Sequence, residues 1–249
     1  SGGFNHNLQG LRVVDLLEER YPEFSGINLT WEVREGIVKH SSAFDKAAEQ
    51  KEFFPDMLPS LETQIVDIAD EIAYDNHDLD DGLTSGLLKD EDLAGLEIWK
   101  NIWGTIFQKY GKIKSQQKKY LVIRSLINLQ VTDLIEEIEK KISRIRPGSS
   151  RDIQSLKCKV AVFSSRMQRL RGPLRKLLIE KLYHHYRVVR MSNKAKRFIK
   201  ELFFLYCGHP DAMPPEIQKR IPLDGIQRAV CDYIAGMTDR YALDEYKKL

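Results

Sequence analysis

Residues 60–82 read SLETQIVDIADEIAYDNHDLDDG, and this stretch decides the fold. At about 100° per residue, its side chains separate onto two faces of a helix. The apolar stripe consists of Leu61, Ile65, Ile68, Ile72 and Leu79. The opposite side carries Asp67, Asp70, Tyr74, His77 and Asp78. Ser60 is placed to cap the first turn. The stretch therefore predicts an amphipathic helix around which the rest of the chain is organised.

The polar side of this helix is rich in carboxylates. Asp70, Tyr74 and Asp78 follow one another at intervals of four residues, so their side chains stack along one edge. The stretch contains no Lys or Arg to neutralise its aspartates. One interpretation is a solvated acidic face. The other is a site for a divalent cation such as Mg²⁺ or Mn²⁺, with Asp70 as the candidate metal ligand.

Outside residues 60–82, the apolar residues of nearly every segment recur with the period of a helix, and no convincing β-hairpin occurs. The longest periodic segment covers residues 116–145, and the loop RPGSS at 146–150 ends it. A second long helix is expected over residues 173–190, with Pro173 in its first turn. We therefore predict an all-α fold, irregular rather than a simple bundle, in which residues 1–249 form a single helical domain.

Composition places the chain among globular proteins. Of its 249 residues, 42% are hydrophobic and 30% are charged. No apolar run approaches the roughly 20 residues of a membrane span, and no secretory signal opens the sequence. The three cysteines lack metal-ligand spacing, so we expect reduced thiols in a cytoplasmic protein.

The net charge of +3 conceals a strong asymmetry. Residues 1–108 hold 8 Lys and Arg against 22 Asp and Glu, a net charge of −14, whereas residues 109–200 hold 25 against 6, a net charge of +19. The basic region would suit a polyphosphate, a nucleic acid or an acidic face of another subunit. Alternatively, the two regions neutralise each other within one fold.

Several segments resemble a known family in the same order along the chain. They are FNHNLQGLR (4–12), INLTWEVREGIVKH (27–40), ADEIAYDNHDLDDG (69–82), LYHHYRVVRMSNKA (182–195) and DYIAGMTDRYAL (232–243). Together they resemble the dGTPase-like deoxynucleoside triphosphate triphosphohydrolases of the HD-domain superfamily. The resemblance implies an HD-domain-like phosphohydrolase fold, a Mg²⁺ or Mn²⁺ cofactor and a homo-oligomer. It also implies hydrolysis of a dNTP to deoxynucleoside and tripolyphosphate.

The same resemblance implies roles for individual residues. Asp70 would complete a metal site made of a His, a His-Asp pair and an Asp. The expected substrate-binding residues are Tyr74 and Asp78 at the sugar, Asn7 and Lys39 in the pocket, Arg175 at the triphosphate and Tyr183 at the nucleoside. For Lys39 and Arg175, an ordinary surface cation is the alternative interpretation.

The chain departs from the family pattern at its catalytic motifs, which precede the FNHN segment in the family and have no match here. His77-Asp78 follows the Asp70 segment and is therefore not the expected His-Asp pair. His6 and His40 do not stand in the expected context either. With one of four metal ligands, this chain alone should bind metal weakly and show no turnover, and the catalytic residues are expected upstream.

A function of another class also fits the sequence. A non-catalytic helical module could bind nucleic acid, including single-stranded DNA, or partner subunits through the basic residues 109–200. Such binding would depend steeply on salt concentration, because many Lys and Arg side chains would contact phosphates.

Overall fold

The computed structural model describes residues 4–41, 48 and 50–248, and over these residues the chain is helical, as predicted. It divides into two compact units, residues 1–182 and 183–249. The predicted single domain stays a prediction. An isolated bridge between Glu19 and Gly26 is the one β-type pairing among the described residues.

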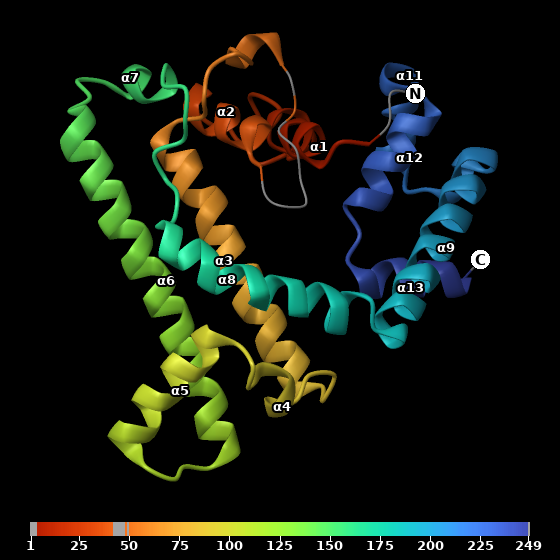
Figure 1. The fold of residues 1–249 in the computed structure, drawn as a ribbon. Helices are drawn as coiled ribbons and strands as arrows, with labels where there is room; N and C mark the ends of the chain where they lie inside the picture. The colour runs from red at the N-terminus through yellow and green to blue at the C-terminus, as the bar shows by residue number, and fades with distance from the viewer. Residues whose placement is uncertain (1–3, 42–47, 49, 249) are drawn as a thin grey trace. The chain divides into compact units, whose positions relative to one another are not determined.

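The first unit contains the helices that surround the central stretch (Figure 1). They are α1 (His6–Arg12), α2 (Trp31–Lys39), α3 (Leu61–Thr84), α4 (Asp90–Leu93), α5 (Glu97–Tyr110), α6 (Ser115–Ile145), α7 (Ser150–Gln154) and α8 (Ser165–Leu178). Single turns of π-helix follow α1 at Val13–Leu17 and α8 at Ile179–Tyr183, and a 3₁₀ turn lies at Lys51–Phe53.

Helix α3 is the predicted central helix. It begins where expected, because the Ser60 side chain accepts a hydrogen bond from the backbone N–H of Thr63. It runs through Gly82 and ends at Thr84. Gly82 is buried, and a Cβ there would lie 2.5 Å from Leu88 Cδ1 and 2.9 Å from Leu88 Cγ, so any larger residue would require the Leu88 side chain to shift.

The core of the first unit forms where α3 packs against α6 and α8, and where α5 packs against α6 and α8. Ile72 and Leu79 of α3 are buried, as their place in the apolar stripe predicts. Ile65, a third member of the stripe, is 37% exposed and lines an apolar groove of about 530 Å³ between α3 and α6. The polar side is not solvated throughout, because Asp67 and Asp75 are both buried.

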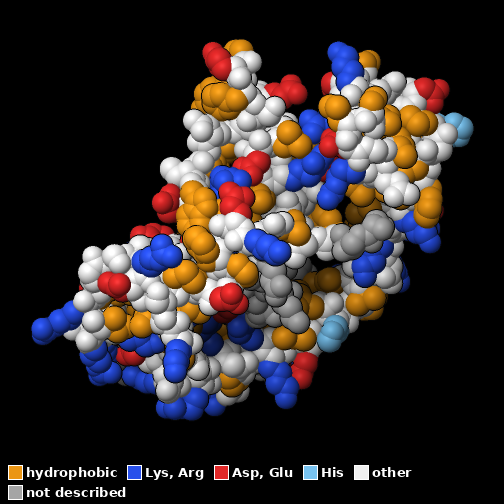
Figure 2. All heavy atoms as spheres, turned by 90° about the horizontal axis from the view of Figure 1, so that it is seen from above, with side chains coloured by type: hydrophobic (Ala, Val, Ile, Leu, Met, Phe, Trp, Pro, Cys, Tyr) orange, Lys and Arg blue, Asp and Glu red, His pale blue; other side chains and the backbone are white. Residues whose placement is uncertain are grey.

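Ion pairs within the first unit join its acidic and basic parts. Helix α3 is neutralised by cations from later in the chain, including Lys159 at Asp67, Arg171 at Asp75 and Lys119 at Asp80. On the face drawn in Figure 2, acidic and basic side chains likewise lie intermixed. The interpretation of these α3 aspartates as uncompensated was therefore wrong, because their partners lie too far along the sequence for a helical spacing to reveal them.

The second unit is a smaller helical cluster. It contains α9 (Tyr186–Gly208), α10 (Pro215–Gln218), α11 (Ile221–Asp224), α12 (Ile226–Ala235) and α13 (Asp239–Lys248), with a 3₁₀ turn at Pro210–Ala212. Its core is built on the buried residues Leu202, Tyr206, Met213 and Val230. Burial, together with a hydrogen bond to Glu245, raises the pKa of the Tyr206 hydroxyl well above its usual range.

Candidate functional site

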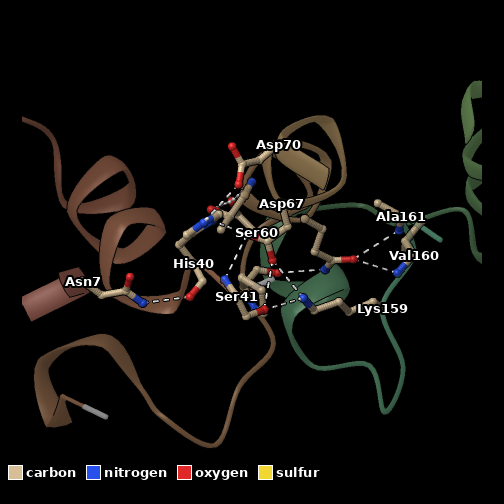
Figure 3. Close-up of polar contacts among 12 residues, drawn as sticks. Asn7, His40, Ser41, Ser60, Asp67, Asp70, Lys159, Val160 and Ala161 are labelled. Carbon is tan, nitrogen blue, oxygen red and sulfur yellow. Dashed lines mark hydrogen bonds and ion pairs between the residues drawn. The ribbon is translucent and has the colours of Figure 1, made fainter. Parts of the chain in front are cut away.

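The candidate site is built on a buried carboxylate, Asp67, in the first half of α3 (Figure 3). Its side chain is 2% exposed and accepts hydrogen bonds from the backbone N–H and hydroxyl of Ser41 at 3.2 and 3.1 Å. Lys159 Nζ lies 2.9 Å from the Oδ2 atom of Asp67 and 3.0 Å from the Ser41 hydroxyl. These contacts satisfy both oxygens of Asp67, which a buried carboxylate requires.

His40 lies between Asp67 and Asp70. It directly follows α2 as the C-terminal capping residue, and its Nδ1 lies 2.7 Å from Asp67 Oδ1. The other ring nitrogen, Nε2, lies 3.8 Å from Asp70 Oδ2. Asp70 is one turn of α3 beyond Asp67, and its side chain is 37% exposed. The imidazole thus joins a buried carboxylate to a partly exposed one.

Both His40 and Asp70 line a cavity of about 790 Å³. Its walls come from α1, α2, α3 and the start of α7, all in the first unit. Among the described residues, the lining includes three carboxylates, Glu32, Glu62 and Asp70, but no Lys or Arg. The cavity is large enough for a nucleotide-sized ligand. Its described wall presents negative rather than positive charge.

Asn7 and Lys39 are buried beside this cavity and make structural contacts. The Asn7 side-chain amide donates to the carbonyl oxygens of Val38 and His40 at 3.1 and 2.8 Å, which fixes the end of α2. Asn7 also lines the cavity. Lys39 Nζ lies 2.8 Å from Glu35 and donates to the Met57 carbonyl at 3.0 Å. The ammonium of Lys39 is therefore engaged inside the unit, and its predicted phosphate contact stays a prediction.

Tyr74 and Asp78 continue along α3 from Asp70 but do not line the cavity. Tyr74 is 56% exposed, and Asp78 is half-buried. Their spacing does place them on the same edge of the helix as Asp70, as predicted. Of these three residues, Asp70 alone lines the cavity. The sugar-binding roles of Tyr74 and Asp78 stay predictions.

Arg175 belongs to a network of four charged residues between α3 and α8. Arg175 lies 3.1 Å from Glu71 and 3.2 Å from Asp75, and Arg171 lies 2.6 Å from Asp75 and 3.5 Å from Glu71. Burial raises the pKa of Asp75 above its ordinary value, although the positive charges of Arg171 and Arg175 lower it. Arg175 is 24% exposed, so part of the guanidinium remains accessible. Its predicted contact with a triphosphate stays a prediction.

Tyr183 is half-buried and belongs to the second unit, whereas the cavity lies in the first. The nearby His185 caps α9, because its Nδ1 accepts from the backbone N–H of Arg187 at 3.3 Å. The role of Tyr183 at a nucleoside stays a prediction.

The described residues around Asp70 offer few ligands for a divalent cation. No group of three or more His, Cys, Asp or Glu side chains within the described parts of the chain is arranged to hold a metal ion. Asp70 and His40 present one oxygen and one nitrogen 3.8 Å apart at the cavity wall. Both are ligands that Mn²⁺ accepts. The chemistry of this pair fits two ligands of a divalent cation, and the described residues do not complete a site for one.

Sequence reasoning missed His40, Asp67 and Lys159 as members of this site. Neither His6 nor His40 stands in the motif context that the family predicts, yet both line the cavity. The available signal was the position of His40 directly after a predicted helix. Lys159 gave no local signal, because it lies 92 residues beyond Asp67.

Comparison with known proteins places the chain in a family. Residues 161–248 match the model of the phosphohydrolase-associated domain, HD_assoc. The chain is 45% identical over 249 residues to a protein of Geobacter sulfurreducens and 44% identical over 252 residues to one of Bordetella pertussis. It is 36% identical over 265 residues to a protein of Parvibaculum lavamentivorans. Each is named a deoxyguanosinetriphosphate triphosphohydrolase-like protein.

None of the helices that the structure describes combines the length and the apolar character needed to cross a membrane.

All three matches include the whole of this chain, which spans 65% of the first two relatives and 67% of the third. The matches confirm the resemblance seen in the sequence motifs. The chain belongs to the dGTPase-like family of the HD-domain superfamily.

Proposed function

We propose that this chain forms part of a metal-dependent enzyme that hydrolyses a deoxynucleoside triphosphate. The observation that carries the proposal is the position of Asp70, whose carboxylate lies at the wall of a cavity of about 790 Å³ beside His40. The names of the relatives support the same reaction class. Because the chain spans 65% of the first relative, the proposal concerns the activity of a protein that includes the remainder.

The proposed reaction adds water across the bond between the α-phosphorus and O5′ of the sugar. The water oxygen bonds to phosphorus, one water proton passes to O5′, and the products are the deoxynucleoside and tripolyphosphate. No oxidation or reduction takes place. A protein accelerates such a transfer mainly by positioning the reactants and stabilising charge.

The described cavity wall explains why the reaction would need a cation. A triphosphate carries several negative charges, and the wall adds Glu32, Glu62 and Asp70 without a Lys or Arg among the described lining residues. The resulting repulsion would disfavour the bare nucleotide. A divalent cation, when bound, neutralises phosphate charge and orients a water molecule. Asp70 is the carboxylate that would hold it.

Substrate recognition would involve residues of α1, α2, α3 and α8 and of the turn of π-helix that follows α8. Asp78 would accept a hydrogen bond from the 3′-hydroxyl, and the Tyr74 ring would crowd the 2′ position and favour deoxyribose. Asn7, which lines the cavity, would contact the nucleotide there. Arg175 and Lys39 would meet phosphate groups, and Tyr183 the nucleoside. These roles, like a homo-oligomeric assembly, rest on the family resemblance.

A chimeric protein tests the proposal. The 249 residues of this chain would replace the aligned part of the Geobacter sulfurreducens relative, which supplies the rest of the length. With dGTP and Mn²⁺, we expect this chimera to release tripolyphosphate and Asp70→Asn to abolish release. Asp81→Asn, an exposed carboxylate on the same helix, is the matched control and should retain activity. Full activity of the Asp70→Asn chimera would refute the proposal.

A second candidate function, nucleic-acid binding, is favoured by the surface of α9. Residues 187–200 of this helix carry six Lys or Arg residues, all exposed, and no Asp or Glu. The guanidinium groups of Arg187 and Arg190 lie over the exposed Tyr186 ring. Titration with single-stranded DNA at two salt concentrations tests this function. Tight binding that weakens steeply with salt would support it, and no binding at low salt would exclude it.

A further inference from the structure

The orientation of the His40 ring is fixed by Asp67. The carboxylate of Asp67 lies 2.9 Å from Lys159 Nζ and accepts hydrogen bonds from the backbone N–H and the hydroxyl of Ser41. A carboxylate surrounded by these donors acts as an acceptor, so the contact of 2.7 Å is made by a proton on His40 Nδ1. In the neutral ring, the lone pair therefore resides on Nε2. Asp67 thus determines both the tautomer of the ring and its direction.

The Nε2 atom of His40 then faces a second carboxylate, Asp70, at 3.8 Å. Two such atoms at this distance are held together by whatever positive charge lies between them, either a proton on Nε2 or a metal cation that binds both atoms. Small divalent cations bind nitrogen and oxygen ligands at about 2.0–2.2 Å. One such ion could therefore contact both His40 Nε2 and Asp70 Oδ2. Both side chains also line the cavity, so an ion between them would be accessible to a ligand.

We propose that His40 is a second protein ligand for the cation held by Asp70, and that Asp67 is its positioning residue. An imidazole that donates its other N–H to a carboxylate is the usual arrangement of a metal-binding histidine. The ion pair between Asp67 and Lys159 connects this arrangement to the segment before α8. This inference rests on the proposed function for the role of Asp70 as a ligand and for the kind of cation, Mn²⁺ or Mg²⁺.

Binding of Mn²⁺ to the purified 249-residue chain tests the proposal directly. The affinity is measured by the loss of the free-Mn²⁺ signal in electron paramagnetic resonance. Coordination by imidazole is detected by ¹⁴N modulation of the electron spin echo. Far-UV circular dichroism and thermal unfolding verify that each variant is folded. Neither readout depends on turnover.

Three variants and one control separate the roles. We expect His40→Gln to weaken Mn²⁺ binding by about tenfold or more and to remove the nitrogen modulation. Asp70→Asn should weaken binding similarly but leave any residual nitrogen modulation in place. Asp67→Asn should weaken binding about tenfold, as the loss of a group that orients a metal ligand does. His77→Gln, an exposed histidine on α3, is the control and should change neither readout.

Unchanged affinity and nitrogen modulation in His40→Gln would overturn the assignment of His40. If Asp70→Asn still weakened binding in that case, the metal role of Asp70 in the proposed function would survive. If the wild-type chain bound Mn²⁺ without nitrogen modulation, or did not bind it at all, the inference would also be refuted. If His40→Gln failed to fold, two other measurements would test the assignment of His40. Nitrogen modulation in the wild type, weakened together with Mn²⁺ affinity in Asp67→Asn, would support it, and modulation and affinity unchanged in Asp67→Asn would contradict it.

Discussion

The Nζ atom of Lys39 lies 2.8 Å from Glu35 Oε1, one helical turn earlier in α2, and the two side chains are 6% and 1% exposed. Glu35 also accepts from the side-chain amide of Gln154 at 2.8 and 3.0 Å. Lys39 donates to the Met57 carbonyl as well. This buried pair therefore joins α2 to α7 and to the segment before α3.

Replacing one member of this pair should destabilise the fold more than replacing both. Lys39→Met leaves Glu35 buried with no cationic partner, and we expect a loss of about 3–5 kcal/mol in the free energy of unfolding. The double variant Lys39→Met/Glu35→Gln removes the unpaired charge and should recover much of that loss. Urea unfolding of the three proteins measures both effects.

The result also separates the two interpretations of Lys39. A loss below about 1 kcal/mol in Lys39→Met would contradict the structural role and would favour a free cation available for phosphate. Lys51→Met serves as the control, because Lys51 is exposed and its replacement should change stability little.

Asp75 predicts a dependence of stability on pH. Burial raises its pKa in the folded protein above the ordinary value of 3.8. The folded state therefore binds this proton more tightly than the unfolded state does. The stability that the protonated carboxyl contributes is fully present below about pH 4 and is lost as the pH rises through the folded pKa.

The asparagine in Asp75→Asn cannot ionise, so this variant should lack the pH-dependent contribution of Asp75 to stability. We expect the unfolding free energy of the wild type, relative to Asp75→Asn, to fall as the pH is raised from 4 to 7. Urea unfolding at several pH values measures this difference, with the exposed Asp81→Asn as control. A difference that stays constant, or that rises with pH, would show that Arg171 and Arg175 outweigh the burial of Asp75.

Several helices could be predicted from sequence because their signals are local. The helix predicted over residues 173–190 was wrong in its bounds, because α8 (Ser165–Leu178) begins before Pro173 and a turn of π-helix separates it from α9. Ser60 caps α3, and the period of 3.6 residues that predicted a helix over residues 116–145 agrees with α6 (Ser115–Ile145). These features depend on side chains within one or two turns of each other. The long uninterrupted helices were therefore the most predictable part of the fold.

The environment of α3 was not predictable in the same way. Hydrophobic periodicity assigned Asp67 to the solvent side, yet Asp67 is buried while Ile65 is 37% exposed. Burial of a carboxylate becomes favourable only when cations arrive from elsewhere, and Lys159 and Arg171 come from 92 and 96 residues away. A helical wheel contains no information about such partners. Asp70 was identified through the family motif, whereas His40 required the three-dimensional arrangement.

Tyr74 provides a test of sugar discrimination. If its ring crowds the 2′ position, Tyr74→Ala in the chimeric protein should reduce the ratio of dGTP to GTP hydrolysis rates by about tenfold, equivalent to about 1.4 kcal/mol. Tyr74→Phe keeps the ring and should retain the ratio. Since Tyr74 is 56% exposed in this chain, its removal should cost little stability. An unchanged ratio in Tyr74→Ala would exclude the steric role.

The isolated 249-residue chain should not hydrolyse dGTP in the presence of Mn²⁺. Its described residues offer the two proposed cation ligands at the cavity, Asp70 and His40, and include no group of three or more potential metal ligands. Two protein ligands leave the cation weakly held and poorly oriented, and misplacement of the reacting groups lowers the rate steeply. Release of tripolyphosphate, followed over hours at high protein concentration, measures the activity.

Asp70→Asn is the essential companion to this assay, because it distinguishes genuine turnover from a contaminating phosphatase. Turnover that persists in Asp70→Asn would be attributed to a contaminant and would leave the expectation intact. Turnover that Asp70→Asn abolishes would show that these 249 residues assemble a working centre by themselves. In that case, further ligands would have to join Asp70 and His40, and the cavity that both residues line is where they would be sought.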